Sequence, residues 1–84
     1  MRVNDLLERR AQLTPERVAV VEEATGRCYT YAELNDRADR TADFLQRLGV
    51  REGDRVAILA HNGVAYVDLL YGLGRIGAIL APLN

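Results

Sequence analysis

Three glycines near the end of the sequence have the spacing of a dinucleotide-binding fingerprint. Gly72, Gly74 and Gly77 fit the pattern G-x-G-x-x-G, whose members follow a strand, open a helix and let the backbone approach a pyrophosphate. Here the glycines close an apolar segment of helical length and precede the aliphatic run 78–81. We therefore interpret them as a helix stop and as positions of close helix–strand packing. Dinucleotide binding through these glycines stays as the weaker alternative.

Other residue types that could do chemistry occur singly. His61 lies between a predicted strand and a predicted helix, where ligands can bind in α/β sheets, but no carboxylate or second histidine is near it in sequence. We interpret His61 as a loop or capping residue and Cys28 as a structural thiol in a hairpin strand. Tyr66 and Tyr71 lie in an apolar helix and are expected in the core or an interface.

The composition excludes several reaction types. The sequence contains no lysine and no serine, and all eleven basic residues are arginine. A phosphate loop of the GxxxxGK[ST] type, a serine nucleophile and lysine-dependent chemistry are therefore impossible within these residues. One histidine and one cysteine provide neither a catalytic triad nor a zinc site. We predict no catalytic, cofactor-binding or metal-binding residue, and we expect the 84-residue chain to be inactive by itself.

Charge and hydropathy indicate a globular protein. A net charge of −1 argues against a nucleic-acid surface, and 49% apolar residues are enough for a core. Residues 64–83 approach the length of a membrane span, but Asp68, Arg75, three glycines and Pro82 argue against one. The N-terminus lacks the continuous apolar stretch of a secretory signal, and a single cysteine fits a reducing compartment. We expect a cytoplasmic protein.

The first half of the chain predicts a helix, a hairpin and a second helix. Residues 3–13 have helical spacing, with Asn4 or Asp5 as cap and Thr14-Pro15 as the end. Residues 18–22 and 27–30 are predicted as hairpin strands around Gly26. A capping box of Thr30 and Glu33 begins a helix that runs to about Leu48, with Gly49 as its C′ residue. Its predicted core stripe is Leu34, Ala38, Thr41 or Ala42, Leu45 and Leu48; its predicted solvated face carries the pairs Glu33–Arg37, Asp36–Arg40 and Asp43–Arg47.

The last third predicts a strand, a helix and a second, parallel strand. The aliphatic runs 56–60 and 78–81 flank an apolar helix over 64–76, which Asn62 is placed to cap. Continuous rather than alternating apolar residues are typical of a parallel sheet that is buried on both faces. The helix is apolar nearly all round, so we expect it to be covered on several sides.

These segments together resemble the start of an AMP-forming acyl-adenylating enzyme. The resemblance covers nearly all of the chain, in order: LLERR at 6–10, TPERVAVV at 14–21, YTYAELNDRA at 29–38, LGVREGDRVAIL at 48–59 and GRIGAILAPLN at 74–84. Arg75 stands where the family usually has lysine. The asparagine of PLN, Asn84, stands where peptide-synthetase domains usually have aspartate, so the ending resembles an acyl-CoA synthetase more closely.

The resemblance implies a fold and a reaction. It places residues 1–84 in the large N-terminal α/β domain of an adenylate-forming ligase, cut off before the phosphate loop. The implied full-length enzyme activates a fatty acid or related acid with ATP and Mg²⁺ as an acyl-adenylate and transfers the acyl group to coenzyme A. The family's catalytic motifs lie beyond residue 84, so the resemblance assigns no site residue here and gives the segment a scaffold role.

The sequence leaves alternatives open. The chain could instead be a non-catalytic structural or interaction module derived from this family. We expect its partner to be the remainder of its own N-terminal domain or a second copy that contacts it through exposed apolar surface. The acyl substrate is not defined by these residues.

Overall fold

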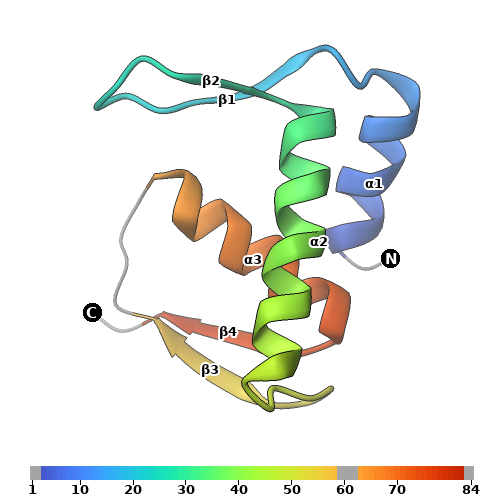
Figure 1. Ribbon diagram of the computed structural model, residues 1–84, viewed down its shortest axis with the longest axis vertical. Helices are drawn as coiled ribbons and strands as arrows, with labels where there is room; N and C mark the ends of the chain where they lie inside the picture. Colours follow the sequence, from blue (N-terminus) through green and yellow to red (C-terminus); the bar gives the residue numbers. More distant parts are fainter. Residues whose placement is uncertain (1–2, 59–62, 83–84) are drawn as a thin grey trace.

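A computed structural model describes residues 3–58 and 63–82 of the chain (Figure 1). The predicted α/β fold class and order of elements are confirmed, with small differences at the strand ends. Of the predicted strand over 56–60, the last two residues lie outside the described ones, as do His61 and Asn62. The elements are α1 (Val3–Leu13), β1 (Val18–Val21), β2 (Cys28–Thr30), α2 (Tyr31–Arg47), β3 (Arg55–Ile58), α3 (Val64–Ile76) and β4 (Ile79–Pro82).

Two crossing helices separate two small sheets. In Figure 1, α2 runs the length of the molecule and α3 crosses it, with the β1–β2 hairpin at one end and the β3–β4 pair at the other. Helix α1 lies beside the N-terminal half of α2. The core is accordingly in two parts. Leu7, Tyr29, Leu34, Ala38 and Val64 form the part near the hairpin, and Ala42, Leu45, Leu73 and Ile76 form the part near the parallel strands.

Local signals in the sequence define both ends of α2. The Thr30 hydroxyl accepts from the Glu33 N–H at 3.2 Å, and the Glu33 carboxylate accepts from the Thr30 N–H at 3.0 Å, which confirms the capping box. Gly49 has φ of +98°, and the Val50 N–H donates to the Leu45 carbonyl, as in a Schellman motif. The predicted core position of Leu48 is wrong: its side chain is 65% exposed, because α3 lies along the face that carries Ala42 and Leu45.

The parallel strands are covered on one face. They pair from Arg55–Ile79 to Ile58–Pro82. Val56 and Leu80 pack against the core of α2 and α3, whereas Ala57 and Ile79 point outward, with Ile79 48% exposed. The prediction that both faces are buried is therefore wrong for the described residues, because both helices that pack on this pair lie on the same side.

Candidate functional site

The three glycines of the fingerprint belong to the end of α3. Gly72 and Gly74 lie inside the helix, and Gly77 follows it with φ of +84°. The Ala78 N–H donates to the Leu73 carbonyl at 3.0 Å, so the predicted helix stop is confirmed. The predicted helix–strand packing is corrected at Gly72: a Cβ there would lie 2.7 Å from Cγ2 of Thr41, which belongs to α2. A pyrophosphate site needs the N-terminus of a helix, so this arrangement does not provide one.

The N-terminus of α3 is closed by a carboxylate from the hairpin. Glu22 Oε2 accepts from the Val64 N–H at 3.2 Å, and Glu22 Oε1 accepts from the Thr25 hydroxyl at 2.9 Å. The hydrogen bonds from Thr25 and then from Val64 hold the pKa of Glu22 below its ordinary value of 4.5. The N-cap residue Gly63 has no side chain for this role. The carboxylate therefore occupies the position where this helix could receive a phosphate.

Charged side chains join α2 to α3 along what we call the α2–α3 seam, defined by Asn35, Arg37, Asp39, Thr41, Asp68, Gly72 and Arg75. The Arg37 guanidinium donates to both carboxylate oxygens of Asp68, with its closest nitrogen at 2.8 Å. Arg75 bonds Asn35 and Asp39, and its side chain is 12% exposed. The hydrogen bond to Asp68 keeps the pKa of Arg37 above its ordinary value. These contacts fix how the two helices cross.

The structure corrects one of the ion pairs predicted for α2 and confirms the other two. Arg37 was expected to pair with Glu33, but Glu33 turns back to cap Thr30 and Arg37 reaches α3. The predicted pairs Asp36–Arg40 and Asp43–Arg47 are present at 3.0 Å. The sequence did contain a signal for the seam. Asp68 and Arg75 are the only charges in the apolar α3, and a charge within such a helix needs a partner on a neighbouring element.

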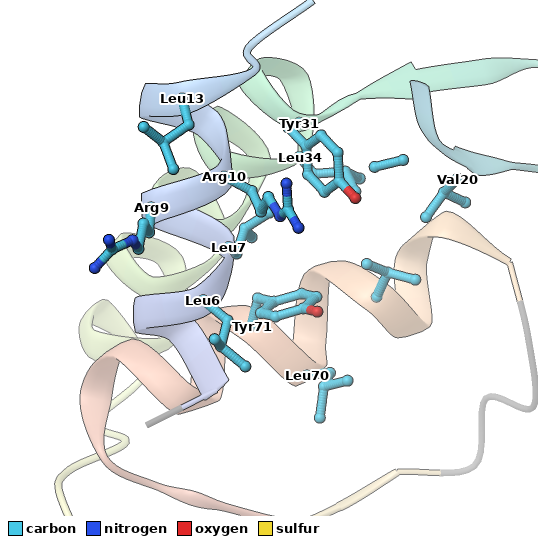
Figure 2. A pocket seen from close by; sticks show the side chains of 12 residues that line it. Leu6, Leu7, Arg9, Arg10, Leu13, Val20, Tyr31, Leu34, Leu70 and Tyr71 are labelled. Atoms are coloured by element: carbon cyan, nitrogen blue, oxygen red, sulfur yellow. The ribbon is translucent and has the colours of Figure 1, made fainter. Parts of the chain in front are cut away.

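A hollow of about 740 Å³ lies on the other side of α3. We call it the α1–α3 groove (Figure 2); it is lined by Leu6, Leu7, Arg9, Arg10, Leu13, Ala19, Val20, Tyr31, Leu34, Val67, Leu70 and Tyr71. Most of these side chains are apolar, and they come from α1, β1, α2 and α3. Sequence reasoning missed the groove, because its lining comes from four separate segments that only the tertiary fold brings together.

The remaining candidate residues are dispersed. Cys28 is exposed on β2, with its thiol 3.9 Å from the Gly26 carbonyl oxygen. Tyr66 is half-buried, and Tyr71 packs against the hairpin part of the core and lines the groove. Among the described residues, no three His, Cys, Asp or Glu side chains are grouped closely enough to hold a metal ion. In the same part of the chain, no helix has the length and apolar character needed to cross a membrane.

Comparison with known proteins gives one consistent result. A sequence model of the "AMP-binding enzyme" family matches residues 7–84. The long-chain-fatty-acid–CoA ligase FadD13 of Mycobacterium tuberculosis is 43% identical over 79 residues, which are 94% of this chain and 16% of that protein. A feruloyl-CoA synthase of Amycolatopsis is 46% identical over 76 residues, which are 90% of this chain and 15% of that protein.

Solved structures agree with the sequence relatives. The inhibitor-bound N-terminal domain of FACL13 from Mycobacterium tuberculosis superimposes with a TM-score of 0.93 at 41% identity, over 99% of this chain and 21% of that domain. A fatty acyl-CoA synthetase of the same organism gives the same TM-score and identity over 16% of its chain. The present chain thus spans about a sixth of the length of these full-length relatives and about a fifth of the N-terminal domain.

Proposed function

Because the chain belongs to the AMP-binding enzyme family, we propose that it is the N-terminal scaffold segment of a carboxylate–CoA ligase. The proposed ligase activates a fatty acid or related acid with ATP as an acyl-adenylate and passes the acyl group to coenzyme A. The observation that supports this best is the match of 99% of the chain to 16% of a fatty acyl-CoA synthetase, at 41% identity and a TM-score of 0.93. We place the protein in the cytoplasm because its single cysteine suits a reducing compartment.

The described residues do not fit the cofactors of that reaction. A nucleotide triphosphate with Mg²⁺ needs backbone N–H groups at a loop or helix N-terminus, cationic side chains and oxygen ligands for the metal. Here the N-terminus of α3 is taken by the Glu22 carboxylate, which repels phosphate. We therefore assign ATP, Mg²⁺ and coenzyme A to other parts of the proposed enzyme and derive no step through them.

The scaffold role follows from how α3 is held. Arg37 and Asn35 of α2 bond Asp68 and Arg75 of α3, so the helix is fixed in both rotation and position along its axis. At its C-terminus, Gly77 turns the chain directly into β4. The consequence is a defined direction for the parallel strands β3 and β4, from whose carboxyl ends the chains of α/β proteins commonly build their ligand sites.

A chimera tests this proposal. The 79 matched residues of FadD13 are replaced by the corresponding residues of this chain, and ATP-dependent acyl-CoA formation is measured with a long-chain fatty acid. We expect activity within about tenfold of the parent, because buried contacts between homologous segments tolerate apolar exchange. Deletion of the segment should abolish activity. A folded chimera without activity would contradict the proposal, as would clear turnover by the 84-residue chain alone.

The second candidate is a non-catalytic interaction module, which the closed α2–α3 seam favours because it needs no further residues. The two functions differ in the isolated chain. A module should melt cooperatively as a monomer and resist proteolysis, whereas a scaffold segment should self-associate through the uncovered face of its parallel strands, where Ile79 is 48% exposed. Sedimentation and thermal melting of the 84-residue chain distinguish them.

A further inference from the structure

We propose that the α1–α3 groove binds an apolar segment that bears an acidic side chain. This segment comes from the rest of the N-terminal domain, which in the solved relatives extends beyond the fifth that this chain matches. The inference rests on the proposed function, since it takes the rest of such a domain as its partner. It adds the surface, the chemistry of the contact and the residue that recognises the acid.

The apolar wall of the groove is incomplete. Leu6 and Leu13 line it from α1 and are 52% and 64% exposed, while Leu7 between them is 4% exposed. Leu70 and Tyr71 on the facing side of α3 are half-buried. Covering these leucines removes their apolar surface from water, which favours binding of a segment that fills the groove. A surface of this kind on both walls of one hollow is typical of an interface.

Two arginines of α1, Arg9 and Arg10, line the groove, and Arg10 is the one that reaches between its walls. Figure 2 shows the Arg10 side chain reaching from α1 into the space between Tyr31 and Tyr71, whose hydroxyl groups face the same space. Arg10 is exposed in this chain, and none of the carboxylates whose side chains the structure describes forms an ion pair with it. A guanidinium in a hollow that becomes covered needs an anionic partner, and a carboxylate can accept from it in a bidentate arrangement. The segment that fills the groove should therefore bring an aspartate or glutamate to Arg10.

The rest of the domain fits this description better than a second copy does. An isologous dimer through the groove would bring the same lining to both sides of the interface, and that lining contains Arg9 and Arg10 but no carboxylate to pair with them. In contrast, the N-terminal domain of FACL13 has about four-fifths of its residues outside the matched segment. Those residues must pack against some surface of the segment, and the groove has the apolar area that such packing requires.

Thiol labelling of the chimera described above tests the location. Cys28 is first replaced by serine, and Leu13→Cys is compared with Phe44→Cys, whose position on α2 lies outside the groove and is 59% exposed, close to the 64% of Leu13. Maleimide modification of each site is followed by peptide mass spectrometry in the 84-residue chain and in the chimera. We expect the chimera to protect Leu13→Cys at least tenfold and to leave Phe44→Cys within twofold.

Three results would overturn the proposal. Equal labelling of Leu13→Cys in the chain and the chimera would mean that nothing fills the groove, and equal protection at Phe44→Cys would remove its specificity. Protection that is already present in the 84-residue chain and grows with concentration would make a second copy the occupant. If the chimera does not melt cooperatively, the same labelling is done on the 84-residue chain co-expressed with the remainder of the relative's domain.

The charge is tested separately by Arg10→Glu and Arg10→Met. We expect Arg10→Glu to lower the melting temperature of the chimera by several degrees more than Arg10→Met, with no such difference in the 84-residue chain. Equal effects of both variants would refute an acidic partner. Labelling and melting do not depend on turnover, so a folded chimera that protects the groove but forms no acyl-CoA would refute the proposed function alone.

Discussion

The two sides of α3 are built differently. Toward α2, Leu73 is 1% exposed, Gly72 lets the helices touch at Thr41, and the charges of Asp68 and Arg75 are paired. Toward α1, the helix faces a hollow of about 740 Å³ in which Leu13 is 64% exposed. The α2–α3 seam satisfies its own groups, whereas the α1–α3 groove leaves apolar surface and a cation for another segment.

This difference separates contacts that stabilise the fold of the chain itself from surface that is available to another segment. A chain of 84 residues hides only about 60–65% of its unfolded surface, so each fully buried side chain is a large share of its stability. The seam and the two parts of the core should therefore carry the folding free energy of the chain. The exposed residues of the groove, Leu6 and Leu13, should contribute little to stability until a partner covers them.

The largest difference between the two sides of α3 is expected for leucine side chains, at Leu73 and Leu13. Leu73→Ala removes a side chain that packs between Ala42, Leu45 and Ile76, and it should lower the free energy of unfolding by about 2–5 kcal/mol. Leu13→Ala removes the same atoms from an exposed position of α1 and should change stability by less than about 0.5 kcal/mol. Urea unfolding followed by circular dichroism measures both. Similar losses would mean that the groove is as closed as the seam.

The next largest effect is expected for the ion pair Arg37–Asp68 between α2 and α3, compared with an exposed pair on α2. Arg37 and Asp68 are 29% and 13% exposed and share three hydrogen bonds, so a double-mutant cycle with Arg37→Ala and Asp68→Ala should give a coupling of about 1.5–3 kcal/mol. The exposed pair Asp36–Arg40 should give about 0–0.5 kcal/mol in the matching cycle. If the two couplings were equal, the Arg37–Asp68 pair would hold the seam no more strongly than an exposed pair does.

Close approach of the helices at Gly72 gives the next effect. Gly72→Val places a Cβ 2.7 Å from Thr41 Cγ2 and 3.3 Å from the Ala42 nitrogen, so the helices must separate, at a loss of about 1–3 kcal/mol. Ala65→Val introduces the same residue at an exposed position of α3 and should cost less than about 0.7 kcal/mol. Thermal melting compares the variants. Adding Thr41→Ala to Gly72→Val should recover part of the loss, and no recovery would place the contact elsewhere.

Elements that depend on neighbouring residues were predicted correctly from the sequence. The capping box at Thr30, the stop at Gly77 and the hairpin around Gly26 each need only a few adjacent residues, and the structure has all three. Predictions failed where a distant segment supplies the partner. Arg37 bonds Asp68 rather than Glu33, and Leu48 is exposed because α3 covers the neighbouring part of α2. Periodicity identifies the apolar stripe of a helix but does not say which part of it another element covers.

Glu22 joins the hairpin to the N-terminus of α3, and its effect on stability should be the smallest and depend on pH. Its carboxylate is hydrogen-bonded in the folded chain, which lowers its pKa below 4.5. A carboxyl group whose pKa is lower in the folded than in the unfolded chain binds more protons when unfolded. Its contribution is therefore complete above the unfolded pKa and is lost as the pH falls below 4.5 through the folded value.

In Glu22→Gln the free energy of unfolding should fall less steeply at acidic pH and should depend on pH near neutrality as in the unchanged chain. The reason is that glutamine keeps an acceptor for the Val64 N–H but does not titrate. Urea midpoints from neutral to acidic pH measure this. Glu23→Gln is the matched control, since its carboxylate holds no hydrogen bond among the described residues. If stability falls as steeply at acidic pH in Glu22→Gln as in the unchanged chain, the loss belongs to Glu33, whose pKa the Thr30 hydrogen bonds also lower. The N-terminus of α3 would then gain little from the charge that now occupies it.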